Sequence, residues 1–429
     1  MTSRRSAVAL LLAAAALTPA ALAQTPAFHR VDPLAGGVST QALRIADDGS
    51  VVCGVSDSPG GELAIRWTIA TGTVSLGVLP DRTGSLASGI SADGSVIVGE
   101  SFPDGRAFRW TSAGMVDLGK PDDSTQSAAR NISPDGSTVV GLVAQLPDEF
   151  FRAAIWTAEG GWTVLGVFDD GPESNCTAAS TDGSIVVGIS DSNLGGRSFR
   201  YTRSDGAFIN IGLSGPLNTA FAADVSANGK YIAGFGGTGG ALAAFRYGFD
   251  EEGSTFDFLP HLPDRTDLVA HGISPNGAVI VGGAGQSNLP EIAFIWTPDS
   301  GTVNIEHVLT THGVSLGGLT LSTGWDVAAD GRTVAGLGRD EEGNNIGWVA
   351  VLPAALVPCN SADVAGLGSS PGWDGALTVD DIVFYLSRFF GGDLAVADIA
   401  SLGGEPVSDG QITVDDLVRF LSQFFSGCQ

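Results

Sequence analysis

The sequence predicts an all-β fold, a seven-bladed β-propeller over residues 24–353, followed by a small all-α module over residues 354–429. Three observations lead to this prediction: a short phrase that recurs seven times, an Asp-Gly or Asn-Gly turn inside each copy, and a change of pattern after Pro353. With 429 residues, 43% of them hydrophobic and 16% charged, the chain is long enough for a large core and too apolar for general disorder.

The recurring phrase is an aliphatic or small residue, Ser or Ala, any residue, Asp or Asn, Gly, and then a β-branched run that ends in Gly. Its turn glycines are 42 to 54 residues apart, and its copies begin at Ile45, Ile90, Ile132, Ala179, Val225, Ile273 and Val327. Each copy predicts a hairpin, because Gly tolerates the positive φ that such turns need. In the second copy we expect strands near residues 86–91, 96–101, 107–111 and 115–118. A four-stranded sheet has two apolar faces, and packing radially against identical neighbours buries both, so seven copies predict seven blades.

The two ends of this region share one repeat. Most copies finish with a fourth strand, but the seventh ends at residues 351–353 without one. An orphan segment at residues 28–34 precedes the first copy and has the missing pattern. We therefore predict that residues 28–34 complete the last blade and close the ring.

The segment at residues 106–119, which follows the second turn, resembles the HAF repeat of extracellular bacterial proteins. The resemblance covers about residues 28–353 and implies export and a repeat fold rather than a known reaction. The His that names the family is absent from all seven copies, so no histidine-borne role carries over. The equivalent positions hold Leu63, Arg106, Arg152, Arg197, Ala243, Ile292 and Ile346.

No catalytic or cofactor-binding residue stands out in the repeats. The five histidines lack metal-ligand spacing, although His307 and His312 are close enough in sequence to approach each other. The turn carboxylates are interpreted as structural rather than as a ring of charge, because Asn228 and Asn276 replace Asp in two copies. Recurring arginines and tryptophans are interpreted as blade-packing residues, with a ligand role as the alternative; they are Arg66, Arg109, Arg200, Arg246, Trp67, Trp110, Trp156 and Trp296. A specific site would lie in irregular insertions such as residues 148–152 and 310–322.

The C-terminal region contains a tandem duplication, a loop and a helix repeated 35 residues on. An Asp-Gly turn precedes each helix, and each helix carries an apolar stripe on which the pair can pack. The stripes are Val379, Ile382, Val383, Leu386, Phe389 and Phe390, and then Val414, Leu417, Val418, Leu421, Phe424 and Phe425.

Both loops match part of an EF-hand. The turn Asp and the Asp seven residues later hold positions five and twelve, where carboxylates converge on Ca²⁺ around a bend that Gly permits. The candidate ligands are Asp374, Thr378, Asp381, Asp409, Thr413 and Asp416. Positions one and three depart from the pattern, with Ser370, Gly372, Glu405 and Val407, and Asp363 and Asp398 replace them only through a longer loop. Calcium is therefore a hypothesis, and its alternative is a helix pair whose aspartates are N-caps.

This duplicated loop–helix module, which ends in Gly427 and Cys428, resembles a dockerin over residues 359–429. The resemblance implies a cohesin-like docking partner on a scaffold or cell surface, often alongside polysaccharide-degrading enzymes. Cys359 and Cys428 bracket the module, and export permits a disulfide between them. Cys53 and Cys176 belong to the first and fourth repeats, too far apart in a ring to bond, so we expect two unpaired thiols.

The N-terminus and the net charge indicate where the protein acts. Arg4 and Arg5, the apolar residues 7–17 and the small residues 21–23 form a predicted signal peptide over residues 1–23. The formal charge of −26 argues against binding nucleic acid or an anionic membrane. We expect no membrane insertion and an extracellular or cell-surface location.

Together these features predict a secreted, non-catalytic propeller with a polysaccharide or protein ligand. Its tail would attach it to a cohesin-like or cell-envelope partner. The alternative is a carbohydrate-active enzyme docked to a cohesin-type scaffold. Paired carboxylates near the central channel would favour the enzyme, whereas an axis of Gly and β-branched residues would favour the binder.

Overall fold

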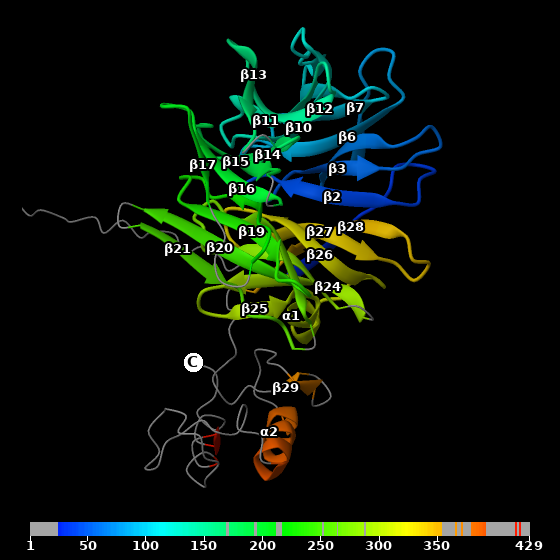
Figure 1. The fold of residues 1–429 in the computed structure, drawn as a ribbon. Helices are drawn as coiled ribbons and strands as arrows, with labels where there is room; N and C mark the ends of the chain where they lie inside the picture. Colours follow the sequence, from blue (N-terminus) through cyan, green and yellow to red (C-terminus); the bar gives the residue numbers. More distant parts are fainter. Residues whose placement is uncertain are drawn as a thin grey trace, which may run out of the picture.

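The computed structural model describes residues 25–168, 171–192, 195–211, 217–250, 253–263, 265–286 and 289–353. In the C-terminal region it describes residues 365–366, 370–371, 379–391, 417 and 420–421. Residues 25–353 form seven four-stranded antiparallel sheets within these described ranges, and the sheets are the blades of a β-propeller (Figure 1).

Each blade begins with an inner strand and continues outward through two further strands. The inner strands are β2 (Thr40–Ile45), β6 (Gly84–Ile90), β10 (Ser124–Ile132), β14 (Ser174–Ala179), β18 (Phe221–Val225), β22 (Asp267–Ile273) and β26 (Thr320–Val327). The second strands are β3 (Val52–Ser56), β7 (Ile97–Phe102), β11 (Thr138–Gln145), β15 (Ile185–Ser190), β19 (Tyr231–Gly237), β23 (Ile280–Gln286) and β27 (Thr333–Arg339). The third strands are β4 (Leu63–Thr68), β8 (Arg106–Thr111), β12 (Phe150–Thr157), β16 (Arg197–Thr202), β20 (Leu242–Asp250), β24 (Leu289–Thr297) and β28 (Asn345–Val351).

The outer strands complete the blades, and they confirm the predicted ring closure. They are β5 (Gly72–Gly77), β9 (Gly114–Asp117), β13 (Gly161–Gly166), β17 (Ala207–Asn210), β21 (Gly253–Phe258), β25 (Gly301–Asn304) and, in the seventh blade, β1 (Ala27–Val31). β1 pairs antiparallel with β28, from Ala27 opposite Val351 to Val31 opposite Gly347. Neighbouring inner strands contact one another all round the axis, including β26 with β2, so the ring is closed.

Turn chemistry explains the conserved positions of the phrase. In all seven copies the turn side chain accepts a hydrogen bond from the N–H two residues later; these side chains are Asp48, Asp93, Asp135, Asp182, Asn228, Asn276 and Asp330. In five copies the preceding Ser donates to that side chain and accepts an N–H from five residues on. An amide oxygen accepts as well as a carboxylate does, which is why Asn replaces Asp and why the structural interpretation is confirmed.

The glycine that ends each phrase is required by a close approach of the inner strand. A Cβ at Gly99 would lie 1.9 Å from the carbonyl oxygen of Leu86, and one at Gly188 would lie 2.1 Å from that of Asn175. The same contact, at no more than 2.5 Å, recurs at Gly54, Gly141, Gly234, Gly282 and Gly336. No side chain fits there, so the repeat retains Gly at this position.

A belt of main-chain hydrogen bonds joins successive blades at the turn side of the ring. The N–H of Asp47 donates to the carbonyl of Ala92, and the N–H of Ala92 donates to that of Pro134. Equivalent bonds link the third blade to the fourth, the fourth to the fifth and the fifth to the sixth, and the N–H of Ala329 in the seventh blade donates to the carbonyl of Asp47 in the first. This belt holds the inner strands in register around the axis.

Some features were not predicted. A short helix, α1 (Ile305–Thr311), connects the sixth and seventh blades, beginning after Asn304, whose side chain accepts the N–H of His307.

Other features agree with the sequence prediction. Trp67 and Trp296 are buried as predicted, and Trp110 and Trp156 pack against the blade cores. Cys53 and Cys176 are buried free thiols, as predicted. No helix among the described residues is long and apolar enough to cross a membrane.

In the C-terminal region the structure describes a small hairpin and one helix, β29 (Ala365–Gly366), β30 (Ser370–Pro371) and α2 (Val379–Gly391). Tyr385 of α2 stacks on Phe420 with ring centroids 3.9 Å apart and an interplanar angle of 6°. These two residues are equivalent in the duplication, 35 positions apart, and both are buried. Phe390, placed in the packing stripe by the sequence, is instead 80% exposed, whereas Phe384 and Tyr385, which the predicted stripe omitted, are buried.

Candidate functional site

The central axis is built from a β-bulge in every inner strand. The register of each inner strand against its neighbour skips one residue, for instance between Ala42 and Arg44 opposite Gly54 and Cys53. The same shift occurs in all seven blades, and the extra residues are Leu43, Ser88, Arg130, Thr177, Ala223, His271 and Trp325. A bulge bends the strand and re-aims its side chains, here toward the axis.

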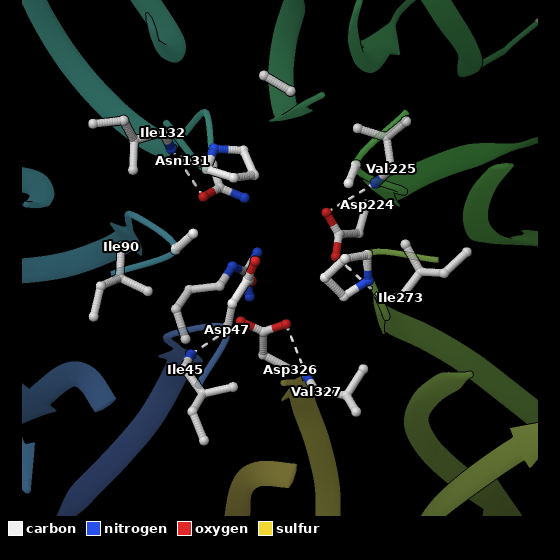
Figure 2. A pocket seen from close by; sticks show the side chains of 16 residues that line it. Ile45, Asp47, Ile90, Asn131, Ile132, Asp224, Val225, Ile273, Asp326 and Val327 are labelled. Atoms are coloured by element: carbon white, nitrogen blue, oxygen red, sulfur yellow. Dashed lines mark hydrogen bonds between the residues drawn. The ribbon is translucent and has the colours of Figure 1, made fainter. Parts of the chain in front are cut away.

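The residues that follow the bulges form a ring, and polar and small side chains alternate along it from the first blade to the seventh. The first, third, fifth and seventh blades contribute Arg44, Asn131, Asp224 and Asp326, whereas the blades between them contribute Gly89, Ala178 and Gly272. A Cβ on Gly89 would lie 2.7 Å from the Cα of Asn131, and one on Gly272 would lie 2.9 Å from that of Asp326. Small residues at three of the seven positions leave room in the narrow axis for the four polar side chains, of which Arg44 and Asp326 are adjacent because the seventh blade meets the first. Figure 2 shows Asn131, Asp224 and Asp326 converging on this space.

Main-chain groups hold both ring carboxylates. Asp326 accepts the N–H of Val327 at 2.8 Å with Oδ1 and that of Ile45, in the first blade, at 3.0 Å with Oδ2. Asp224 likewise accepts the N–H of Val225 at 2.8 Å and that of Ile273, in the sixth blade, at 3.1 Å (Figure 2). Each carboxylate thus clamps its own blade to the next one, while Asn131 accepts only the N–H of Ile132, at 2.9 Å.

The same confinement perturbs the acidity of these groups. Burial raises the pKa of Asp326 to about 7, with Arg44 opposing the rise and Asp224 adding to it. Burial also raises the pKa of Asp224, again against the pull of Arg44. Asp47, at the turn side of the ring, has a raised pKa because of burial and the charge of Asp48. On the turn side these acids and Arg44 surround a small cavity of about 70 Å³.

A larger cavity of about 290 Å³ opens on the other side of the ring, and we call it the channel mouth. It is lined by Leu43, Arg44, Ser88, Arg130, Asn175, Thr177, Ala223, His271 and Trp325. Three buried polar atoms here have no hydrogen-bond partner in the protein: Arg44 Nε, Asn175 Oδ1 and Trp325 Nε1. Buried polar atoms are normally paired, so three orphans from the first, fourth and seventh blades around one cavity indicate a binding site.

The mouth carries positive charge and one aromatic pair. The ring centroids of His271 and Trp325 are 4.1 Å apart. Burial and the charge of Arg44 lower the pKa of His271 to about 4, so this imidazole is neutral at pH 7. Arg130 lies 3.6 Å from Glu100 and is half-buried, and none of the nine lining residues is acidic.

Several residues singled out in the sequence lie away from this site. Arg246 binds its own Asp257 at 3.0 Å and reaches the carbonyl of Gly277 in the next blade at 3.4 Å, as predicted for a packing residue. Arg200 donates to Thr202 in its own blade, and its guanidinium lies 4.6 Å from the centroid of the Phe249 ring in the next blade, so it contacts the neighbouring blade through its packing rather than through a hydrogen bond. The insertion at 310–322 borders a cavity of about 560 Å³, where Glu306 accepts the N–H of Leu321.

The sequence interpretation missed the axis. It gave His271 no role beyond the lack of metal-ligand spacing, but His271 is an inner-strand residue facing the channel, because the bulge turns it inward. The sequence signal for the axis was the pair of residues immediately before each recurring phrase, because a propeller places these two residues on its axis. The axis is neither the Gly and β-branched lining expected of a binder nor a pair of free carboxylates expected of an enzyme, since both acids are held by main-chain N–H groups.

The predicted tail ligands fall mostly outside the described residues. Asp381 lies in α2, whereas Asp363, Asp374, Thr378, Asp398, Asp409, Thr413 and Asp416 lie outside, as do Cys359 and Cys428. Within the part of the chain that the structure describes, no three His, Cys, Asp or Glu side chains are arranged to hold a metal ion.

No protein-family model matches the sequence, and no curated protein is similar to it in sequence. Solved structures match at the level of fold. An oligogalacturonate lyase from Vibrio parahaemolyticus is 11% identical with a TM-score of 0.52, and the match covers 77% of this chain and 98% of that one. The β-propeller domain of Cps50 from Myceliophteria thermophila is 12% identical with a TM-score of 0.48, over 76% and 99% of the two chains.

TolB from Acinetobacter baumannii is 16% identical with a TM-score of 0.44, and the match covers 59% of this chain and spans 62% of that TolB. At these identities the likenesses concern the fold alone. The seven sheets and their ring closure show that the chain is a seven-bladed β-propeller, and the likeness to the lyase agrees with this fold.

Proposed function

We propose that this protein is an exported, non-catalytic binding propeller that takes its ligand at the channel mouth. The observation that carries the proposal is the cluster of three unpartnered buried polar atoms, on Arg44, Asn175 and Trp325, around one cavity. Leaving such atoms unpaired costs about 1–3 kcal/mol each, and a ligand that pairs them recovers this free energy on binding.

The side chains at the mouth favour binding over catalysis. A hydrolase needs a positioned acid or base, and no carboxylate lines this cavity. Among the residues that line the mouth, His271 is the one candidate for a general base, because it is neutral at pH 7. Its ring, however, is packed against Trp325. The ring acids beyond the mouth each use both oxygens to hold main-chain N–H groups.

Binding without turnover is testable on a panel of extracellular polysaccharides such as pectin, alginate, xylan and cellulose. We expect the full chain to be retarded in gels containing at least one of them, with no new reducing ends released. The double variant R130Q/W325F should lose the retardation. The control R109Q should keep it, because Arg109 belongs to a separate Arg–Trp cavity beside Trp156.

The alternative, a carbohydrate-active enzyme, rests on the pKa of about 7 at Asp326, which suits a general acid. It requires new reducing ends in the same assay and their loss in D326N. Retardation that survives R130Q/W325F would overturn the channel mouth as the binding site.

The proposal includes docking through residues 354–429 to a cohesin-like or cell-envelope partner, with Ca²⁺ in the duplicated loops and a Cys359–Cys428 disulfide. The duplication itself and the stacking of the equivalent Tyr385 and Phe420 support a paired module. Export is supported by the signal-peptide pattern at residues 1–23.

Calorimetric titration of the full chain with Ca²⁺ tests the tail. We expect heat of binding that is lost in the variant D374N/D409N and unchanged in D48N/D330N, which alters turn carboxylates of the propeller. Absence of heat in the unaltered chain would contradict calcium binding and leave the N-cap interpretation of these aspartates.

A further inference from the structure

We infer that the channel mouth recognises an acidic sugar residue, a pyranose ring bearing a carboxylate. The inference rests on the proposed function and names the ligand class of the same site. It follows from three properties of the mouth: its charge, its division into donors and acceptors, and its apolar wall.

The charge of the mouth selects an anion. Arg44 and Arg130 both line the cavity, and no acidic residue does. Arg130 lies 3.6 Å from Glu100, too far for a close ion pair, so its guanidinium retains capacity for a second carboxylate. Arg44 donates to the carbonyl of Leu43 with Nη1, and its Nε is unpartnered. In a chain of formal charge −26, a cavity lined by two arginines and by no acidic residue is a local exception.

The hydroxyl groups at the mouth select a ligand that also donates. Ser88 donates its hydroxyl hydrogen to the carbonyl of Ala129 at 2.7 Å, and Thr177 donates to that of Ala222 at 3.0 Å. Their remaining lone pairs are therefore acceptors, as is the unpartnered Oδ1 of Asn175. A bare carboxylate or a sulfate offers nothing to these three acceptors, whereas the hydroxyls of a sugar do.

The remaining wall suits a sugar ring. Trp325, packed against His271 at an interplanar angle of 40°, and the side chains of Leu43 and Ala223 provide an apolar face. The cavity of about 290 Å³ is at the small end of ligand sites, which corresponds to one ring rather than to a stretch of polymer. The ligand is thus a terminal or exposed acidic residue of a chain.

The inference is tested by titrating the full chain with four monosaccharides in matched pairs, glucuronate against glucose and galacturonate against galactose, and with acetate. Each pair differs only by a carboxylate in place of a hydroxymethyl group. We expect at least one uronate to bind with a dissociation constant of about 1 mM, at least tenfold tighter than its neutral partner and than acetate.

Variants locate the binding. R130Q should weaken the uronate at least tenfold while leaving the neutral sugar unchanged, and W325F, which keeps an aromatic ring but removes the indole N–H, should weaken both. R109Q should alter neither, and melting curves will show whether each variant is folded. Equal affinity within each pair, with W325F still weakening both, would overturn the acidic ligand but retain the binding site. Uronate binding that R130Q and W325F leave intact would overturn the channel mouth itself, and no binding by any probe would overturn the inference.

Discussion

A chain that begins at residue 40 is expected to lose about 5 kcal/mol or more of unfolding free energy, a large part of the stability of an ordinary domain. It lacks β1, so β28 becomes a free edge and the seventh blade is reduced to three strands. Val31, fully buried in this interface, and the contact of Phe28 with Trp348 at 6.3 Å between ring centroids are lost with it. The bond from the Thr40 hydroxyl to the Val31 carbonyl is lost as well. Because the ring is held shut by this one blade, the damage extends to every blade-to-blade contact.

Thermal or denaturant unfolding of the shortened chain, against one that begins at residue 24, measures the effect. Two point variants provide a matched pair on β1 and just after it. V31D should reproduce much of the loss by placing a charge in the core, whereas D32A, at an exposed side chain, should change little. An unchanged melting temperature in the shortened chain would show that the ring does not depend on β1.

Replacement of Asp326 by Ala is expected to destabilise the propeller by about 2–4 kcal/mol, because two main-chain N–H groups lose their acceptor and Arg44 loses a counter-charge. The affected donors are the N–H groups of Val327 and of Ile45, which belong to the seventh and first blades. D326N should cost less, because Asn131 shows that an amide can accept the N–H of the following residue at this ring position. The exposed D299A is the control for the change in charge.

The pH dependence of these variants has a defined sign. The folded pKa of Asp326, about 7, lies above the ordinary value of 3.8 for an aspartate, so the folded protein binds a proton that the unfolded chain does not between those two pH values. Unfolding free energy therefore rises as pH falls from about 7 to about 5, and the advantage of the unaltered protein over D326N should grow by about 1–2 kcal/mol. Asp224 and Arg44 face the same space and are common to both proteins. A difference that is flat with pH would mean that Asp326 is ionised as in water.

The blade architecture was predictable because its determinants are local. The turn side chain, the Ser before it and the Gly of the second strand each act within one hairpin. Every copy of the phrase therefore contains the residues that determine its own hairpin. The strands expected near 86–91 and 96–101 occur at Gly84–Ile90 and Ile97–Phe102. Even the non-local pairing of β1 with β28 was accessible, since the repeat left one vacant strand position and one spare strand.

The candidate site was not predictable in the same way, because the residues that form it are those in which the repeats differ. Ring positions held by Arg44, Gly89 and Asn131 share no pattern that periodicity detects. Their meaning depends on the bulge, which turns two successive residues of each inner strand toward the axis, and on the neighbours they meet there.

The sequence by itself thus determined the number of blades, the chemistry of their turns and the closure of the ring, because hairpins and vacant strand positions are properties of short segments and their count. Only the tertiary structure decided that Arg44, Arg130, Asn175 and Trp325 share a cavity. The first and last of these are 281 positions apart, and only the closing of seven sheets around one axis brings such residues within reach of a single ligand.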